Sequence, residues 1–411
     1  MKIVIIGGGA SGLMAATAAR ETNPTAEIVI LEKNEAIGKK LLLTGGGRCN
    51  VTTGLDDIQA VLKHYPRGAK FLTSALHRFP PAATRKFFEK QGVPLKTEAD
   101  QRVFPQSEDG RDIVHVFTKL FARSQITVKN GATVERVEKT PDGFLLQLRG
   151  GTKPLTADHL IIATGGQAYR QTGSTGDGYA FAESLGHSLT DLHPSLSNLK
   201  TQEKWPAKLS GVSFARARLM VSKNKKLAQL GPFLFTHRGI SGPAVFALSA
   251  LIAKEKITAQ QPLKINIDLF PDESNEKILT RLQMLIASAK QRAFCNVLAE
   301  LIPKSLAQLA CGELQLNPTS HSAEISKKDL RRLTDWLRAI PLHITDRTAG
   351  EEFVTAGGIE LTEVNPSTME SKLCPGLFFT GEILNMDGFT GGFNLQAAWS
   401  TGHLAGTNAA K

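Results

Sequence analysis

The stretch KIVIIGGGASGLMAATAAR (residues 2–20) decides the fold of this chain. It starts with a short β-branched run, passes through the pattern G-x-G-x-x-G and continues as a helix of small residues. The next strand pattern, AEIVILEK (26–33), ends at Glu32, at about the 20-residue spacing that is typical of the dinucleotide-binding fingerprint. Strand, glycines, helix and terminal acid together predict a Rossmann-like α/β domain.

Each glycine of this fingerprint has its own task. Gly7 allows the tight turn, and Gly9 lets the backbone approach a pyrophosphate at the positive end of the helix dipole. Gly12 permits close packing of helix on strand, and Glu32 can accept hydrogen bonds from a ribose diol. A glycine triplet alone would be weak evidence, because turns also use glycine for conformational reasons.

Two later stretches favour FAD over a nicotinamide dinucleotide. LTADHLIIATGG (155–166) predicts a buried strand that ends in Thr164-Gly165-Gly166. GLFFTGEILNMDGFTGGFNLQAAWSTGHLAG (376–406) predicts a strand that ends in Gly381-Glu382, and then a helix that Gly391-Gly392 opens. These are marks of the two-dinucleotide-binding-domain flavoproteins, in which the late acid reaches the ribityl or pyrophosphate part of FAD. The final helix then points its N-terminus at the flavin, where its dipole stabilises the anionic reduced form.

The glycine-rich loop LLLTGGGRCNVTTG (41–54) raises the question of a redox cysteine. Flavoprotein disulfide reductases carry two cysteines five positions apart in this region, and here the second position is Gly54, which excludes a dithiol mechanism for this loop. The loop is therefore expected to cradle the cofactor, with contributions from Gly45, Gly46, Arg48, Asn50 and Cys49. No second G-x-G-x-x-G follows a strand, so NAD(P)H as hydride donor would dock only transiently.

The composition sets outer bounds. A chain of 411 residues exceeds what one hydrophobic core usually organises, and 41% hydrophobic and 21% charged residues are ordinary for a soluble globular protein. No apolar run approaches the roughly 20 residues of a membrane span. The four cysteines form no C-x-x-C pair and have no histidine at metal spacing, which argues against a metal site and fits a reduced, cytoplasmic protein.

The net charge of +11 permits nucleic acid, anionic lipid or an acidic substrate as partner. One segment is strongly basic and contains a single acid, Glu203; its basic residues are Lys200, Lys204, Lys208, Arg216, Arg218, Lys223, Lys225 and Lys226. The segment is either a solvated face of a basic protein or a surface that contacts RNA phosphates.

The chain resembles a known family along nearly its whole length. The matching motifs are GKKLLLTGGGRCNVT (38–52), RVFPQS (102–107), ATGGQAYRQTGSTGDGYAFAESLGH (163–187), THRGISGPAVFALS (236–249), TAGGIELTEVNPSTMESKLCPGLFFTGEI (355–383) and DGFTGGFNLQAAWSTGHLAG (387–406). They are similar to those of bacterial BaiN/RdsA-like flavoproteins, also called aminoacetone-oxidase-like FAD enzymes.

This resemblance implies an α/β fold with a discontinuous, glutathione-reductase-like FAD-binding domain, interrupted by a β-rich domain that carries a helical subdomain. Short strand patterns after His193 and helical periodicity from Asp272 agree with that layout. The expected segments are 1–192 (FAD domain), 193–271 (β-rich domain), 272–325 (helical insertion), 326–350 (return of the β-rich domain) and 351–411 (FAD domain).

The fingerprint, the later motifs and the resemblance together give a set of residues expected to hold FAD. The set is Gly7, Gly8, Gly9, Ala10, Ser11, Gly12, Glu32, Lys33, Gly45, Gly46, Arg48, Cys49, Asn50, Val134, Thr164, Gly165, Gly166, Gly381, Glu382, Gly391, Gly392, Asn394 and Leu395.

Members of the family are described as oxidising an amino ketone, reducing steroid-like enones or forming dihydrouridine in large-subunit ribosomal RNA. Reduction of uridine would need a hydride and an acid that protonates the other carbon; Cys49 and then His237 are the expected catalytic residues, ahead of Tyr169 and Arg102. The uneven positive charge favours an RNA-uridine reductase. A small-molecule oxidoreductase and a non-catalytic, flavin-bearing RNA-binding protein are the alternatives.

Overall fold

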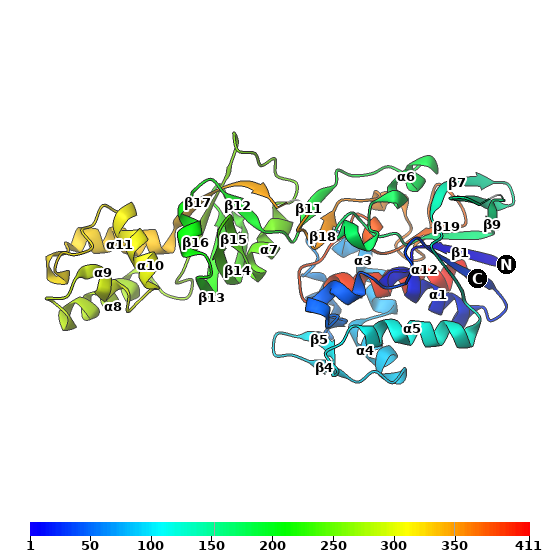
Figure 1. Ribbon diagram of the computed structural model, residues 1–411, viewed down its shortest axis with the longest axis horizontal. Helices are drawn as coiled ribbons and strands as arrows, with labels where there is room; N and C mark the ends of the chain where they lie inside the picture. The colour runs from blue at the N-terminus through cyan, green and yellow to red at the C-terminus, as the bar shows by residue number, and fades with distance from the viewer. Residues whose placement is uncertain (152, 349) are drawn as a thin grey trace. The chain divides into compact units, whose positions relative to one another are not determined.

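The computed structural model describes residues 1–151, 153–348 and 350–411 (Figure 1). The chain divides into two compact units: unit 1 comprises Met1–Ser195 and Glu352–Lys411, and unit 2 comprises Leu196–Glu351. Unit 2 is therefore an insertion in the sequence of unit 1. The five domain segments expected from the sequence remain predictions.

A parallel sheet lies at the centre of unit 1, in the order β19-β10-β1-β2-β6. Ile3, Val4 and Ile5 of its central strand are fully buried, as expected for a parallel strand that is covered on both faces. The register pairs Ile6 with Ile162 on one side and Leu31 on the other, so three strands end at the same edge. The strands are β1 (Lys2–Ile6), β2 (Glu27–Glu32), β6 (Thr127–Asn130), β10 (His159–Ile162) and β19 (Leu377–Phe379).

The first and last helices, α1 (Ala10–Thr22) and α12 (Phe393–Ala409), pack against each other (Figure 1). A Cβ atom at Gly402 would lie 2.3 Å from the carbonyl oxygen of Ser11, and one at Gly406 would lie 2.0 Å from that of Ala15. Glycine at both positions allows backbone to pack on backbone. The C-terminal helix is thus fixed beside the helix that follows the glycine fingerprint.

Smaller elements complete unit 1. Two antiparallel sheets have the orders β7-β8-β9 and β3-β5-β4, and a strand pair, β11 with β18, lies where the chain leaves for unit 2 and returns from it. The strands are β3 (Thr52–Thr53), β4 (Leu95–Thr97), β5 (Arg102–Pro105), β7 (Val134–Thr140), β8 (Gly143–Leu148), β9 (Leu155–Ala157), β11 (His193–Ser195) and β18 (Val354–Ala356). The helices are α2 (Ile58–Leu62), α3 (Ala69–Arg78), α4 (Pro81–Lys90), α5 (Arg111–Ser124) and α6 (Asp177–Ser184).

Unit 2 is a closed β-barrel in the order β12-β15-β14-β13-β16-β17. Ala217, Leu219 and Val221 alternate into its core, as barrel strands require. Its strands are β12 (Leu199–Thr201), β13 (Ser213–Val221), β14 (Asn224–Thr236), β15 (Gly239–Ser241), β16 (Leu263–Asp268) and β17 (Ile340–Arg347). Its helices are α7 (Pro243–Leu251), α8 (Asn275–Ser288), α9 (Phe294–Leu298), α10 (Lys304–Glu313) and α11 (Lys327–Arg338).

The predicted fold class is confirmed. A discontinuous α/β unit with a parallel sheet is interrupted by a β-rich unit, and helices α8 to α11 are inserted between two neighbouring barrel strands, β16 and β17. The sequence indicated short strands in this region, but it did not indicate that they close into a barrel. Closure depends on pairings between strands that are far apart in the chain, such as β12 with β17.

Candidate cofactor site

The glycine turn between β1 and α1 is held by close packing. Gly7 has φ 110°, and a Cβ there would lie 2.5 Å from the carbonyl oxygen of Ala163. A Cβ at Gly12 would lie 2.0 Å from the carbonyl oxygen of Gly7. Both positions therefore require glycine for reasons internal to the protein, as the fingerprint predicts.

Gly9 differs from its two neighbours in the fingerprint. Its dihedrals are φ −85° and ψ −176°, which any residue can adopt, and a Cβ there would meet none of the described residues within 4 Å. Neither backbone strain nor protein packing accounts for glycine at this position. Gly9 caps the N-terminus of α1, whose first turn carries no acidic residue. Open space beside a bare helix N-terminus fits the close approach of an anionic group such as a pyrophosphate.

Glu32, the acid at the end of β2, is bound to the same turn. Its Oε2 accepts a hydrogen bond from the backbone N–H of Gly8 (2.8 Å), and its Oε1 accepts from the backbone N–H of Asn34 (2.8 Å) and from Nδ2 of Asn34 (2.6 Å). These bonds fix the orientation of the carboxylate. Because a carboxylate oxygen can accept two hydrogen bonds, Oε2 retains capacity for a hydroxyl donor.

A second wall forms where the turn after β10 meets β18 and the end of β19. The Thr355 hydroxyl lies 2.6 Å from where a Cβ of Gly166 would be. The backbone N–H of Thr355 donates to Oε1 of Glu382 (2.8 Å), and Lys40 Nζ lies 2.8 Å from the other oxygen of Glu382. The buried hydroxyl of Thr164 has no hydrogen-bond partner among the described residues. The structure thus joins two segments that the sequence predicted for the cofactor.

Gly381 connects this wall to the fingerprint. Its φ is 78°, and a Cβ there would lie 2.5 Å from the hydroxyl oxygen of Ser11 in the first turn of α1. Its backbone N–H donates to the Thr401 hydroxyl of α12 (3.1 Å). The end of β19 therefore lies directly beside the N-terminus of α1.

The glycine-rich loop meets the N-terminus of α12. A Cβ at Gly392, the N-cap of α12, would lie 2.2 Å from the carbonyl oxygen of Thr52, near the end of the loop. Trp399 Nε1 donates to the carbonyl oxygen of Val51 (2.9 Å). Asn394 uses its side chain to hold the turn before the helix, since its Oδ1 accepts from the backbone N–H of Gly388 (2.8 Å). Val51 and Thr52 of the loop thus contact the N-terminal part of α12, and the cofactor contacts predicted for 45–50 and 391–395 stay a prediction.

Two predicted cofactor contacts have other partners here. The Arg48 guanidinium lies 3.8 Å over the ring of Phe104 and forms ion pairs with Glu98 (2.8 Å) and Glu108 (3.0 Å). Lys33 Nζ lies 2.6 Å from Oδ2 of Asp177. For both side chains, cofactor binding remains a prediction that these contacts do not support.

Cys49 lies in the core of unit 1. It is 0% exposed, and a Cβ added at Gly110 would lie 3.1 Å from the Cβ of Cys49. Burial raises the pKa of the Cys49 thiol to about 12, so the thiol stays protonated at neutral pH. A catalytic acid must reach its substrate. The catalytic role predicted for Cys49 stays a prediction, and its full burial gives that role no support.

The other acid candidates are spread over both units. His237 is exposed at the turn between β14 and β15 in unit 2. Tyr169 in unit 1 has φ 58° and is stacked parallel to Phe353, with ring centroids 6.0 Å apart; Lys40 Nζ lies 5.9 Å from its ring centroid. Arg102 is paired with Glu98 and Asp100. The structure therefore does not bring Cys49 and His237 together within one unit.

Lys40 is a residue of this site that the sequence analysis missed. Lys40, just before the glycine-rich loop, pairs with Glu382, whereas its neighbour Lys39 is exposed and lies 3.3 Å from Oδ1 of Asn34. Two adjacent lysines look alike in a sequence, and only the placement of the distant Glu382 distinguishes them.

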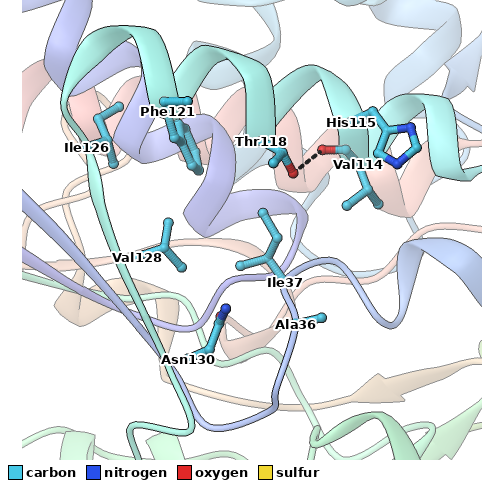
Figure 2. A pocket seen from close by; sticks show the side chains of 10 residues that line it. Ala36, Ile37, Val114, His115, Thr118, Phe121, Ile126, Val128 and Asn130 are labelled. Carbon is cyan, nitrogen blue, oxygen red and sulfur yellow. Dashed lines mark hydrogen bonds between the residues drawn. The ribbon is translucent and has the colours of Figure 1, made fainter.

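A shallow cavity of about 510 Å³ lies elsewhere on unit 1, between α5, β6 and the loop after β2 (Figure 2). Apolar side chains from α5, β6 and the loops beside them line most of it, and the polar residues His115, Thr118 and Asn130 lie among them. Its lining residues are Ala36, Ile37, Val114, His115, Thr118, Phe121, Ala122, Ile126, Val128 and Asn130. None of them belongs to the set predicted to hold the cofactor.

The predicted basic surface lies on the barrel of unit 2. Arg216 and Arg218 alternate with inward side chains along β13, so they point out of the barrel wall. Lys223 lies in the turn between β13 and β14, Lys225 and Lys226 lie at the start of β14, and all three are exposed. Two members are neutralised: Lys200 pairs with Asp346 (2.9 Å) and Arg216 with Asp272 (2.6 Å). The other basic residues of the segment form no ion pair within the part of the chain that the structure describes.

Comparisons with known proteins extend over nearly the whole chain. Residues 1–408 match the family described as HI0933-like protein Rossmann domain. The 3-dehydro-bile acid delta(4,6)-reductase of Clostridium scindens is 32% identical and covers 100% of this chain and 99% of its own length. The ribosomal RNA dihydrouridine synthase of Escherichia coli is 28% identical, over 97% of this chain and 95% of its own length.

A solved structure shares the fold. The 3-ketosteroid-delta4-(5alpha)-dehydrogenase of Rhodococcus jostii RHA1 superposes with a TM-score of 0.52 at 13% identity, and the match covers 100% of this chain and 96% of that one. Over the described ranges, no helix is long and apolar enough to cross a membrane. Within the same ranges, no group of three or more His, Cys, Asp and Glu side chains could hold a metal ion.

Proposed function

The chain belongs to the HI0933-like Rossmann-domain family, and from that premise we propose that it reduces a uridine of large-subunit ribosomal RNA to dihydrouridine. It is an FAD-dependent oxidoreductase. The observation that carries the proposal is the whole-chain match to two reductive enzymes. One is named for reducing delta(4,6) bonds of a bile acid and the other for making dihydrouridine in ribosomal RNA, so both names describe saturation of a carbon–carbon double bond.

The side chains and backbone groups of unit 1 fit FAD. The open space beside Gly9 supports a pyrophosphate at the N-terminus of α1, and the free acceptor capacity of Glu32 supports a ribose diol at the end of β2. Gly381 and Glu382 border the same place from the opposite strand. FAD, when bound, supplies the hydride.

The N-terminus of α12 serves the chemistry electrostatically. The first N–H groups of a helix have no partner within it, and the dipole makes that end positive. No acidic residue lies in the first turn of α12, and its N-cap residue, Gly392, has no side chain that could cap the helix. This helix end therefore stabilises negative charge on a group placed before it.

Reduction of a double bond also needs a proton on the second carbon. Of the two donors that the sequence suggests, Cys49 and His237, we propose His237. His237 is the first to substitute, because its side chain is exposed whereas that of Cys49 is fully buried. A general acid typically contributes 10²- to 10⁴-fold to a rate, so a proton donor should be identified easily by substitution.

The basic surface of unit 2 supports RNA as the substrate class. Its positive side chains would neutralise phosphates, which makes binding weaken steeply with salt. A uridine must also be unstacked before its ring can reach the cofactor. Transient NAD(P)H as hydride donor and a cytoplasmic location complete the proposal.

Mapping dihydrouridine in the large-subunit ribosomal RNA of the host, with and without this gene, tests the proposal. We expect one dihydrouridine to disappear on deletion and to return with the wild-type gene. An unchanged map would reject the RNA substrate. If the purified protein binds FAD but no acceptor reoxidises its reduced flavin, the result would favour the non-catalytic alternative.

A small-molecule reductase is the second candidate, and one observation favours it. The bile-acid reductase is 32% identical to this chain, compared with 28% for the ribosomal RNA enzyme of Escherichia coli. This candidate predicts rapid anaerobic reoxidation of the reduced protein by a small enone or amino ketone without RNA. Stopped-flow absorbance of the flavin, with and without RNA, separates the two candidates.

A further inference from the structure

The turn that leads into α12 is clamped by one short segment of unit 1, His64–Arg67. The backbone N–H of Phe389 donates to the carbonyl oxygen of His64 (2.9 Å), and the Tyr65 hydroxyl donates to the carbonyl oxygen of Phe393 (2.7 Å). The His64 ring stacks on the Phe393 ring, with centroids 4.1 Å apart and planes 9° apart. This segment therefore holds both ends of the turn.

An ion pair completes the clamp. Arg67 donates from Nε to Oδ1 and from Nη2 to Oδ2 of Asp387, both at 2.5 Å, and a backbone bridge joins the same two residues. The Asp387 side chain is 0% exposed and that of Arg67 is 13% exposed. Burial raises the pKa of the Asp387 carboxyl, and Arg67 opposes that effect. A two-pronged guanidinium–carboxylate pair fixes orientation as well as distance.

A third partner ties this carboxylate to a strand from another part of the sequence. The Ser195 hydroxyl donates to Oδ2 of Asp387 (2.7 Å) and accepts from Nη2 of Arg67 (3.3 Å). Ser195 is fully buried, and it is the last residue of β11 and of unit 1 before the chain enters unit 2. Ser195 also pairs with Val354 of β18, the strand by which the chain returns. The Asp387 carboxylate thus links the start of α12 to β11, where the chain leaves unit 1. Because β11 pairs with β18, it also links α12 to the strand by which the chain returns.

The contacts of Asp387 are polar and directional, whereas packing alone would need only apolar side chains. A buried ion pair is weak evidence for stability, because well-packed apolar residues often serve as well. What such a pair does provide is a defined geometry. The element it orients here is the helix N-terminus that the proposed function places before the flavin.

We infer that Asp387 is a positioning residue for the flavin-facing turn of α12, with Arg67 and Ser195 as the contacts that set its orientation. This inference rests on the proposed function. It follows that the affinity and the reduction potential of bound FAD depend on the Ser195 hydroxyl, although Ser195 is not among the residues expected to touch the cofactor.

Two serines make a matched test. Ser195 and Ser197 are two positions apart and both are 0% exposed, but the Ser197 hydroxyl has no hydrogen-bond partner among the described residues. The holoenzymes of S195A and S197A are compared with wild type for the rate of FAD release and for the flavin midpoint potential. We expect S195A to release FAD about tenfold faster, the usual effect of losing a hydrogen bond to a charged group, and to shift the midpoint potential. S197A should stay within about twofold of wild type in release rate.

A second variant guards against a trivial loss of folding. R67K keeps the positive charge but cannot form two parallel hydrogen bonds, so it should change both flavin readouts in the same direction as S195A. Thermal unfolding of each apoprotein separates a folding defect from a positioning defect. The inference is overturned if S195A lowers stability but has the same rate of FAD release and the same flavin midpoint potential as S197A. A wild-type chain that binds no FAD overturns the proposed function, and this inference with it.

Discussion

Unit 1 and unit 2 carry different kinds of candidate site. In unit 1, glycines stand where backbone meets backbone, as at Gly12 and Gly392, and they bring segments from both ends of the chain into one site. Unit 2 is a barrel whose outward-facing positions on β13 carry Arg216 and Arg218. Under the proposed function, cofactor binding by unit 1 would depend on backbone geometry, whereas RNA binding by unit 2 would depend on exposed charge. The two kinds of site should respond differently to substitution.

The largest effect is expected for Gly12→Val. Its Cβ would lie 2.0 Å from the carbonyl oxygen of Gly7, and that neighbour is backbone and cannot move aside. We expect unit 1 to lose about 3 kcal/mol or more of stability, the upper range for overpacking in a core. Urea unfolding followed by circular dichroism measures the loss. Wild-type stability in this variant would show that the turn is not packed as described.

Gly9→Val should separate binding from folding. No described residue lies within 4 Å of its Cβ position and its φ is −85°, so the apoprotein should lose no more than about 1 kcal/mol, the usual cost of an apolar N-cap residue. FAD affinity should fall by at least about tenfold, because the side chain would occupy the space beside the helix N-terminus. Quenching of flavin fluorescence on titration gives the dissociation constant. Unchanged affinity in this variant would remove the pyrophosphate from this turn.

A triple substitution tests the exposed charge of unit 2. K223Q/K225Q/K226Q should weaken binding to structured RNA on the order of tenfold and flatten its salt dependence, because fewer phosphates are neutralised. K327Q/K328Q, on exposed positions of α11, is the control. Filter binding at several salt concentrations measures both variants. FAD affinity should be unchanged in each, and equal RNA binding by the two variants would reduce the basic surface to a solvated face.

The smallest effect is expected for Cys49→Ala. Burial raises the pKa of this thiol to about 12, and the side chain is 0% exposed, so it should neither ionise near neutral pH nor touch a substrate. The rate of substrate-dependent flavin reoxidation should stay within about threefold of wild type from about pH 6 to about pH 8. Stopped-flow absorbance measures this rate. A loss of about a hundredfold would instead establish the thiol as the proton donor.

Local motifs in unit 1 could be interpreted from the sequence because each one specifies its own backbone. The fingerprint turn has the packing that its glycines predicted, and the motifs around Gly381 and Gly392 lie beside it and beside the glycine-rich loop. Side-chain partners could not be inferred in this way. The partners of Arg48 are Glu98 and Glu108, and the sequence of the loop does not indicate that these two acids lie beside it.

The sequence alone determined the fold class of unit 1 and the dinucleotide fingerprint, because strand, turn and helix follow from residues that are close together in the chain. Only the tertiary structure decided that the unit 2 strands close into a barrel, that Lys40 reaches Glu382, and that Asp387 joins Arg67 and Ser195. Those contacts join residues far apart in sequence. Their geometry depends on how whole elements pack, and local patterns of hydrophobicity and glycine carry no information about it.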